Sequence, residues 1–325
     1  MNRGADCVEH LAWRLAPEQG TRPDTAHRSF KLRLPDRRTA PVSTAIMPYE
    51  GKMSFIEKLK RSWKKGNSLL CVGLDPDLSR FPKPIDKNIE SIFSFNREII
   101  DATHDLVCAY KPQIAYFSAV SAEKQLEKTI DYIRSNYPHI PVILDAKRGD
   151  IGSTAEMYTK EAFSRYNVDA VTVNPYMGYD SAEPFLQHKD RGIILLCRTS
   201  NNGAGDLQDL IVDGVPIYEH VARLISEKWN FNRNCLLVVG ATWPSKMSRI
   251  RSIVGDMPFL VPGVGAQGGN VKEMVTAGQT ANGTGLIISS SRAILYASNG
   301  IDFAEAARSE TIKLKNTVNQ FRNTA

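Results

Sequence analysis

The chain has 325 residues, 42% hydrophobic and 23% charged, which is the composition of an ordinary globular protein. Its net charge of +6 is spread along the chain with no long basic block, and this disfavours a nucleic-acid partner while leaving room for a small anionic ligand. No apolar run approaches the roughly 20 residues of a membrane-spanning helix, so we expect no membrane partner.

Residues 1–50 are rich in Pro, Arg and Thr and show little periodicity, so we predict a disordered N-terminal extension there. An upstream start codon or an interaction role would also account for this segment. It lacks the continuous apolar region of a secretory signal. Met53 then opens a predicted helix ending near Gly66, with apolar residues at helical spacing: Phe55, Ile56, Leu59 and Trp63. We predict one catalytic domain over residues 53–325.

The five cysteines, Cys7, Cys71, Cys108, Cys197 and Cys235, match no zinc or redox spacing, and their odd number argues against a complete disulfide framework. The last four lie in or beside apolar runs. This pattern favours buried free thiols in a reducing cytosol, and hence a cytoplasmic location.

Short apolar runs alternate with amphipathic segments along the rest of the chain. The segments 121–138 and 217–229 repeat apolar residues every three or four positions, as helices do. Continuous apolar strands alternating with helices indicate a parallel sheet covered on both faces. Eight strands in this length predict a (β/α)8 TIM barrel, with a doubly wound open sheet as the alternative. The predicted strands are 69–74, 107–111, 141–145, 170–174, 193–197, 236–240, 259–262 and 286–289.

Charged residues follow the third of these strands in the stretch LDAKRGD. In an extended strand Asp145 and Lys147 project to the same side, and Lys111, at the end of the neighbouring strand, can reach them. With Asp150 they would form a network at the barrel mouth that can hold an ammonium beside a developing carbanion. The alternative is a salt-bridge cluster that closes the barrel mouth, and it is weakened because several strand ends contribute.

Two further strand ends resemble a phosphate site. PGVGAQGG follows the seventh strand and SSSR the eighth, which are the two loops that barrel enzymes often use for phosphate. The glycines allow backbone N–H groups to approach an anion, and Gln267 and Arg292 offer an amide and a planar guanidinium.

The motif D-x-K-x-x-D, here Asp145 to Asp150, resembles the orotidine 5′-phosphate decarboxylase family. The fuller LDAKRGDIGSTA, with YKPQIAYF before it and VPGVGAQGG and SSSRAILYA after it, is similar to the longer subclass of that family. The resemblance covers residues 53 to the C-terminus. It implies a (β/α)8 barrel, a homodimer with active sites at the interface, and conversion of orotidine 5′-phosphate to UMP and CO2, the last step of de novo pyrimidine synthesis. It also implies that no metal or organic cofactor is used.

By the same resemblance, Lys147 would donate a proton to C6 of the substrate and Asp145 would lie beside the substrate carboxylate. Lys111 and Asp75 would hold the network and the ribose hydroxyls. Three groups of residues complete the implied site: Asp150, Ile151 and Thr154 in the site of the partner subunit; Ser200, or its neighbour Thr199 or Asn201, at the pyrimidine; and Gln267 and Arg292 at the phosphate.

Two other functions compete with this one. A related barrel acting on a sugar phosphate with Mg²⁺ would need a further carboxylate for the metal, and no clear candidate exists beyond the aspartates already assigned. A non-catalytic nucleotide-binding module could dispense with Lys147, so the intact set of Lys111, Asp145, Lys147 and Asp150 argues against it.

Overall fold

The structure is a computed structural model that describes residues 53–264 and 270–323. The predicted N-terminal extension, Cys7 and Gln267 lie outside the described residues. All elements named below belong to the compact unit Gly51–Ala325.

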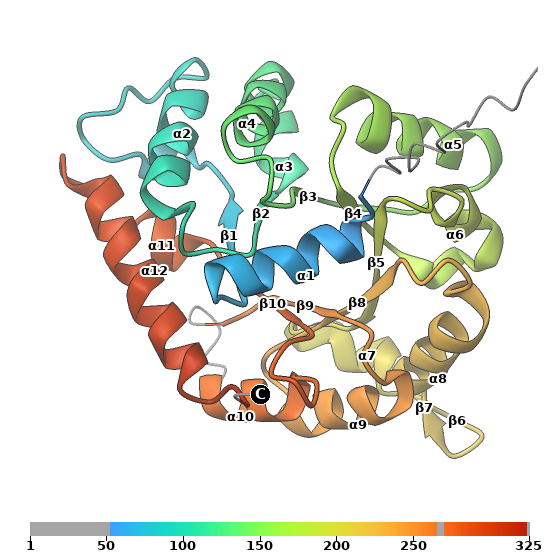
Figure 1. Ribbon diagram of the computed structural model, residues 1–325. Coiled ribbons are helices and arrows are strands. Elements are labelled where there is room, and N and C mark those ends of the chain that lie inside the picture. The colour runs from blue at the N-terminus through green and yellow to red at the C-terminus, as the bar shows by residue number, and fades with distance from the viewer. Residues whose placement is uncertain (1–52, 265–269, 324–325) are drawn as a thin grey trace, which may run out of the picture. The chain divides into compact units, whose positions relative to one another are not determined.

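Within the described residues, eight parallel strands form the sheet at the centre of the unit (Figure 1). Their order is β2-β1-β10-β9-β8-β5-β4-β3. The two edge strands meet through isolated parallel bridges from Tyr110 to Val142 and from Gln113 to Asp145, which bring the sheet round into a barrel. The predicted (β/α)8 barrel is confirmed, and the open-sheet alternative is wrong. The strands are β1 (Leu70–Leu74), β2 (Ala109–Pro112), β3 (Ile143–Arg148), β4 (Ala170–Val173), β5 (Gly192–Arg198), β8 (Cys235–Val239), β9 (Phe259–Val261) and β10 (Leu286–Ser290), with a separate hairpin of β6 (Ile211–Val212) and β7 (Val215–Pro216).

The helices between the strands bury their apolar faces against the outside of the barrel. The two predicted amphipathic segments are confirmed as α4 and α8, and α8 continues into a π-helical turn over Ile225–Trp229. The helices are α1 (Phe55–Gly66), α2 (Ser91–Thr103), α3 (Ile114–Ser118), α4 (Glu123–Asn136), α5 (Gly152–Lys160), α6 (Tyr179–Leu186), α7 (Gly205–Gln208), α8 (Ile217–Leu224), α9 (Pro244–Val254), α10 (Val271–Gly278), α11 (Arg292–Leu295) and α12 (Phe303–Asn319).

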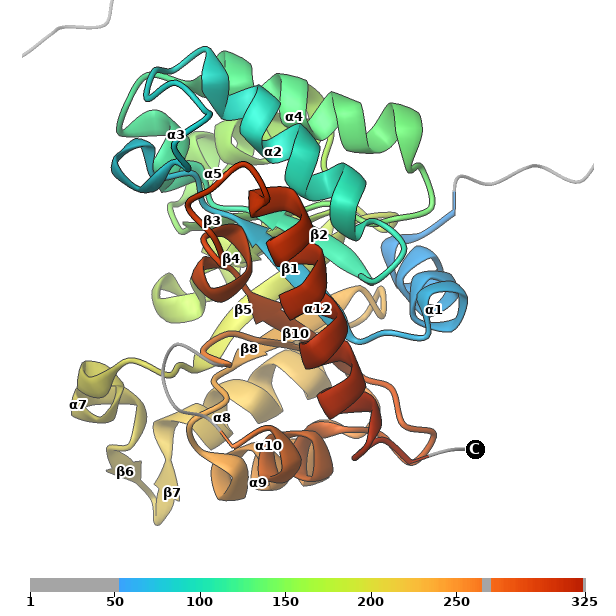
Figure 2. The ribbon, with the colours of Figure 1, turned by 90° about the vertical axis from the view of Figure 1, so that its left-hand side faces the viewer.

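Helix α1, which the apolar spacing predicts, lies across the amino-terminal end of the barrel. Its start is fixed by a capping box in which Ser54 and Glu57 satisfy each other's backbone N–H groups. Phe55 N–H donates to the carbonyl of Asp190, which lies just before β5, and Ser62 Oγ donates to the carbonyl of Cys108, just before β2. Figure 2 shows α1 on one side of the barrel and α7, which follows β5, on the other.

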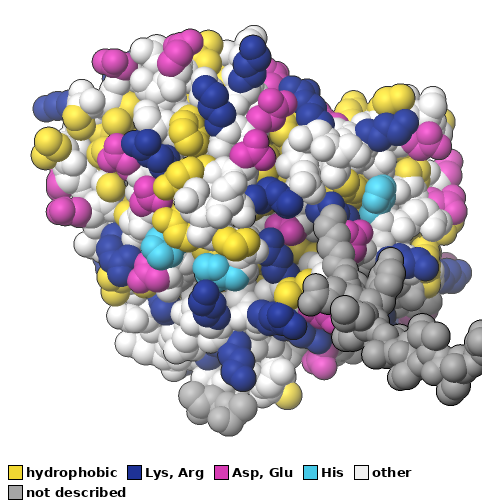
Figure 3. Space-filling view, turned by 45° about the horizontal axis from the view of Figure 1, so that its top comes forward, with side chains coloured by type: hydrophobic (Ala, Val, Ile, Leu, Met, Phe, Trp, Pro, Cys, Tyr) yellow, Lys and Arg dark blue, Asp and Glu magenta, His cyan; other side chains and the backbone are white. Residues whose placement is uncertain are grey.

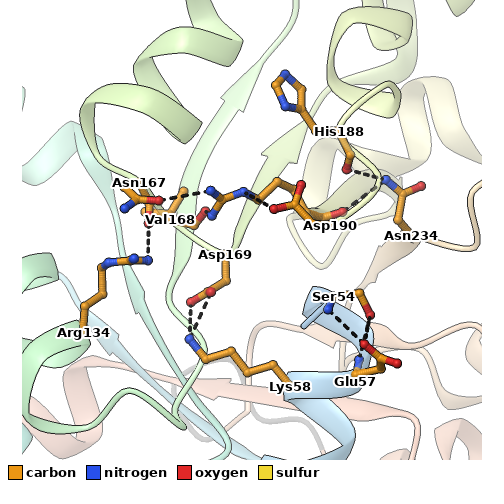
Figure 4. A network of polar contacts seen from close by, with 11 residues as sticks. Ser54, Glu57, Lys58, Arg134, Asn167, Val168, Asp169, His188, Asp190 and Asn234 are labelled. Atoms are coloured by element: carbon orange, nitrogen blue, oxygen red, sulfur yellow. Dashed lines mark hydrogen bonds and ion pairs between the residues drawn. The ribbon is translucent and has the colours of Figure 1, made fainter. Parts of the chain in front are cut away.

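Polar contacts gather around the starts of β4 and β5, and one of them comes from α1 (Figure 4). Lys58 Nζ lies 3.0 and 2.9 Å from the two carboxylate oxygens of Asp169, just before β4. Arg134 donates to the carbonyl of Asn167, and Arg191 to the carbonyl of Val168. A cavity of about 310 Å³ lies among these side chains. Because its principal charged groups are paired with one another or with backbone carbonyls, we assign it a structural role.

The four described cysteines are buried free thiols, as predicted: Cys71, Cys108, Cys197 and Cys235. Burial raises the pKa of Cys71, Cys197 and Cys235 to about 12, which leaves these thiols unreactive at neutral pH.

The surface in Figure 3 carries Lys and Arg side chains among Asp and Glu side chains over much of its area. In the part of the chain that the structure describes, no helix is both long and apolar enough to cross a bilayer.

Candidate active site

A cavity of about 220 Å³ opens at the carboxyl ends of the strands, opposite α1. Parallel strands of a barrel deliver their last side chains to this end, where barrel enzymes carry out their chemistry. Five strand ends contribute: β1, β2, β3, β9 and β10. The lining includes Asp75, Lys111, Gln113, Tyr116, Asp145, Pro262, Gly263, Val264, Ser289, Ser290, Ser291 and Arg292.

Among the residues that line this cavity, the Asp145 carboxylate lies between two ammonium groups, as predicted. Lys111 Nζ is 3.1 Å from Asp145 Oδ2, and Lys147 Nζ is 2.6 Å from Asp145 Oδ1. Burial alone would raise the pKa of Asp145, but the two ammonium groups outweigh it and hold that pKa well below its usual range. Burial lowers the pKa of Lys111, yet the Asp145 and Asp75 carboxylates reverse this and raise it. Asp145 and Lys111 are therefore both charged at neutral pH.

Lys147 meets Asp145 by a different route from the extended strand that the sequence predicts. Leu144 pairs with Val171 of β4, but the next pair joins Arg148 to Val173. Three residues of β3, 145 to 147, thus lie opposite the single residue Thr172, and Lys147 takes a left-handed backbone conformation with φ of 46°. The bulge re-aims the lysine side chain, which is 46% exposed, towards the barrel mouth.

Asp75 lies at the end of β1 in the same cavity, within reach of the lysine network. Its Oδ1 atom is buried and has no hydrogen-bond partner among the described residues. A buried carboxylate oxygen without a donor is costly. This atom can therefore accept a hydrogen bond from a ligand hydroxyl.

The loops after β9 and β10 bring Gly263 and Arg292 to the other side of the cavity. Gly73 leaves room for this wall, because a Cβ atom there would collide with the hydroxyl of Ser291. Arg292 is exposed at the start of α11, where it can meet an anion entering the cavity. Gln267, its predicted partner, falls in the undescribed segment 265–269.

The loop after β5 is held close to the strand end of β8. A Cβ atom on Gly240 would lie 2.7 Å from Ser200 N, so glycine is required for this approach. The backbone N–H of Thr199 donates to Gln208 Oε1 at 2.8 Å, and the Thr199 hydroxyl donates to Asn201 Oδ1. Ser200 is half-buried, and it does not line the cavity described above.

Asp150 is not brought to Lys111 and Lys147 within the chain, contrary to the network predicted from the strand end. Its Oδ1 atom accepts from the backbone N–H of Ile151 at 2.8 Å. Ile151 is 50% exposed, and Thr154, on the first turn of α5, is exposed as well. These three residues form a surface beside the cavity mouth.

Comparison with known proteins decides the family. Residues 68–307 match the orotidine 5′-phosphate decarboxylase / HUMPS family. The chain belongs to the orotidine 5′-phosphate decarboxylase family. It is 67% identical over 273 residues to the orotidine 5′-phosphate decarboxylase of Cellvibrio japonicus, a match that covers 83% of this chain and all of that protein. The enzyme of the same name from Janthinobacterium is 58% identical over 269 residues, covering 83% of this chain and 99% of that protein.

Solved structures of family members show the same barrel. The Leishmania donovani OMP decarboxylase is 38% identical with a TM-score of 0.70, and the match covers 81% of this chain and 99% of that one. The Leishmania donovani UMP synthase is 40% identical with a TM-score of 0.75, covering 83% of this chain and 56% of that longer one.

Two residues that were not predicted from the sequence contact residues of the cavity. The hydroxyl of Thr172 contacts both Asp145 and the β3 bulge. Tyr296 accepts from Asp77 N at 2.7 Å and donates to the carbonyl of Asp75 at 3.1 Å, which ties the segment after α11 to the β1 loop. The sequence signal for Thr172 is a hydroxyl inside an otherwise apolar strand; Tyr296 has none, since its partners lie more than 200 residues away.

In the ranges 53–264 and 270–323, no group of three or more His, Cys, Asp or Glu side chains is arranged to hold a metal ion.

Proposed function

We propose that this protein decarboxylates orotidine 5′-phosphate to UMP and CO2, the last step of UMP biosynthesis, and that it works in the cytoplasm. Its relatives carry the name of that activity. The observation that carries the proposal is the Lys111–Asp145–Lys147 network, which places a paired ammonium at the mouth of a cavity that also contains Arg292. This arrangement suits a substrate with an anion at each end.

The chemical step breaks the bond between C6 and the carboxylate, and the electron pair of that bond remains on C6. The resulting carbanion has little delocalisation, so a fixed positive charge beside it lowers the barrier. Lys147 supplies that charge, donates a proton to C6, and regains a proton from water. Asp145 holds the ammonium in place, and its own charge lies next to the substrate carboxylate.

Groups away from C6 bind the rest of the substrate. The unpartnered Oδ1 of Asp75 accepts a hydrogen bond from a ribose hydroxyl, and Gln267 and Arg292 bind the phosphate. The proposed contact of Ser200 with the pyrimidine comes from the loop after β5, which lies outside the cavity lining described above. Binding energy from the phosphate can then be used to position the reacting carbon against Lys147.

Direct assay tests this function. We expect the purified protein to consume orotidine 5′-phosphate in the presence of EDTA, followed as the change in ultraviolet absorbance, with UMP identified as the product by chromatography. EDTA is included because the charge that stabilises C6 comes from a lysine. Absence of turnover by folded protein would refute the proposal and favour the Mg²⁺-dependent sugar-phosphate barrels. Turnover of orotidine 5′-phosphate that EDTA abolishes would refute the metal-free mechanism.

We further propose a homodimer in which Asp150, Ile151 and Thr154 enter the active site of the partner subunit. The support is local: Asp150 does not reach the lysines of its own chain, and Ile151 leaves an apolar side chain half exposed beside the mouth. A partner subunit packed against this surface would bury the Ile151 side chain.

Mixing two inactive variants tests this exchange. If Asp150 serves the partner's site, Lys147→Ala and Asp150→Ala are each expected to be inactive, but a dimer containing one of each has one intact site. Refolding or subunit exchange of an equal mixture should therefore restore about one quarter of the wild-type activity, since half the dimers are mixed. An inactive mixture whose mixed dimers are verified by mass spectrometry would show that Asp150 acts within its own chain.

A further inference from the structure

The hydroxyl group of Thr172 has three hydrogen-bond partners, all on β3. It accepts from the backbone N–H groups of Ala146 and Lys147, both at 2.9 Å, and it donates to Asp145 Oδ1 at 3.0 Å. A threonine hydroxyl has one donor and two acceptor positions, so this geometry uses all of them. The side chain is buried, with 1% of its surface exposed.

These contacts coincide with the irregular part of the barrel. Opposite Thr172, β3 bulges and Lys147 takes a left-handed conformation that a residue with a Cβ atom adopts at a cost. The bulge also takes the N–H groups of residues 146 and 147 out of the regular strand ladder. The Thr172 hydroxyl replaces the missing acceptor, so it stabilises the backbone conformation from which the Lys147 side chain projects.

The same hydroxyl orients the carboxylate. Asp145 Oδ1 receives both the Thr172 O–H and the Lys147 ammonium, while Oδ2 receives Lys111. With these donors in place the carboxylate plane is fixed, and the position of the Lys147 nitrogen follows from it. The Thr172 hydroxyl holds both the backbone of Lys147 and the carboxylate that pairs with its side chain. The Lys147 ammonium therefore loses little conformational entropy when it reaches the transition state.

We propose that Thr172 is a positioning residue for the reaction, setting the location of the Lys147 ammonium through the bulge and through Asp145. This inference rests on the proposed decarboxylase function. Thr172 does not line the cavity, so it acts through its neighbours and contributes little to substrate affinity.

The test compares Thr172→Val, which keeps the shape but removes the hydroxyl, with Thr172→Ser, which keeps the hydroxyl. We expect Thr172→Val to lower kcat about 10- to 100-fold because the ammonium is displaced from C6. The affinity for UMP, measured by calorimetry, should stay within about threefold, since the phosphate and ribose contacts remain. Thr172→Ser should recover most of the lost kcat.

Thr311→Val is the matched control. Thr311 is equally buried, but its hydroxyl donates to the carbonyl of Ala307 within α12, far along the chain from the site. It should lower stability without changing kcat per UMP-binding site. Should Thr172→Val fail to fold, Thr172→Ala is the second variant, because its smaller side chain leaves room for water to bond the two N–H groups.

The possible results separate the inference from the function it rests on. Wild-type turnover with an unchanged kcat in Thr172→Val or Thr172→Ala would overturn the positioning role and leave the decarboxylase function standing. A kcat in Thr172→Ser as low as in Thr172→Val would also overturn it, since the hydroxyl would then not be the active feature. No turnover by the wild type would instead refute the proposed function.

Discussion

Replacing Lys147 by alanine is expected to lower kcat for orotidine 5′-phosphate by at least about 10⁴-fold, since one side chain provides both the charge beside C6 and the proton. The fold should persist, because Lys147 is 46% exposed and its removal leaves Asp145 paired with Lys111. The affinity for UMP should change little, because the groups proposed to bind phosphate and ribose are untouched. Steady-state kinetics and calorimetry with UMP measure the two effects.

The matched control is Lys313→Ala on α12, a lysine that is 75% exposed and pairs with Glu310 at 3.7 Å. It should leave kcat unchanged. A Lys147→Ala variant that is folded, binds UMP and still turns over within tenfold of the wild type would remove Lys147 from the chemistry.

The second large effect is expected for Asp145→Asn, which should reduce both activity and stability. Lys111 is buried, and without the carboxylate its charge loses its hydrogen-bonded partner. Breaking a buried pair in this way costs about 3–5 kcal/mol of unfolding free energy. The lysines would also lose the anion that fixes their positions, so we expect kcat to fall by at least about 100-fold. Urea unfolding at pH 7 measures the first effect, and the assay measures the second.

The pH dependence follows from the shifted pKa values. Asp145 has a folded-state pKa below its unfolded value, so its contribution to stability is present above about pH 4 and is lost as the pH falls towards the folded-state pKa. The stability difference between wild type and Asp145→Asn should therefore shrink below about pH 4. Asp105→Asn is the control: its pair with Arg308 is about half exposed, and its loss should cost no more than about 1 kcal/mol. If Asp145→Asn and Asp105→Asn lowered the free energy of unfolding equally, burial would not strengthen the contribution of the Asp145 pairs to stability.

Much of the fold and part of the site could be predicted because both depend on local patterns. Apolar runs specify buried strands wherever they occur, and the strands of a parallel barrel must deliver their last residues to one end. Lys111 and Asp145 therefore had to lie close together once the strands were recognised. The contact needed no knowledge of side-chain detail, since neighbouring strands are about 5 Å apart.

Other parts of the site depend on relations that the sequence does not state. The position of Lys147 depends on the register shift between β3 and β4 around Thr172. A strand pattern in the sequence predicts regular pairing without such a shift. Tyr296 reaches the β1 loop from the opposite end of the chain. Asp150 follows a glycine in a loop, and its role in the proposed partner site depends on a second subunit, about which the strand pattern of one chain carries no information.

The position of α1 has a practical consequence for attaching this protein to a label or a solid support. The helix lies over the barrel end opposite the cavity, and Lys60, Lys64 and Lys65 are exposed along it. The described cysteines are buried with high pKa values, so a cysteine introduced at Lys64 would be far more reactive towards a maleimide than any of these. In a molecule tethered there, the cavity at the carboxyl ends of the strands would face away from the support and stay open to solvent and substrate.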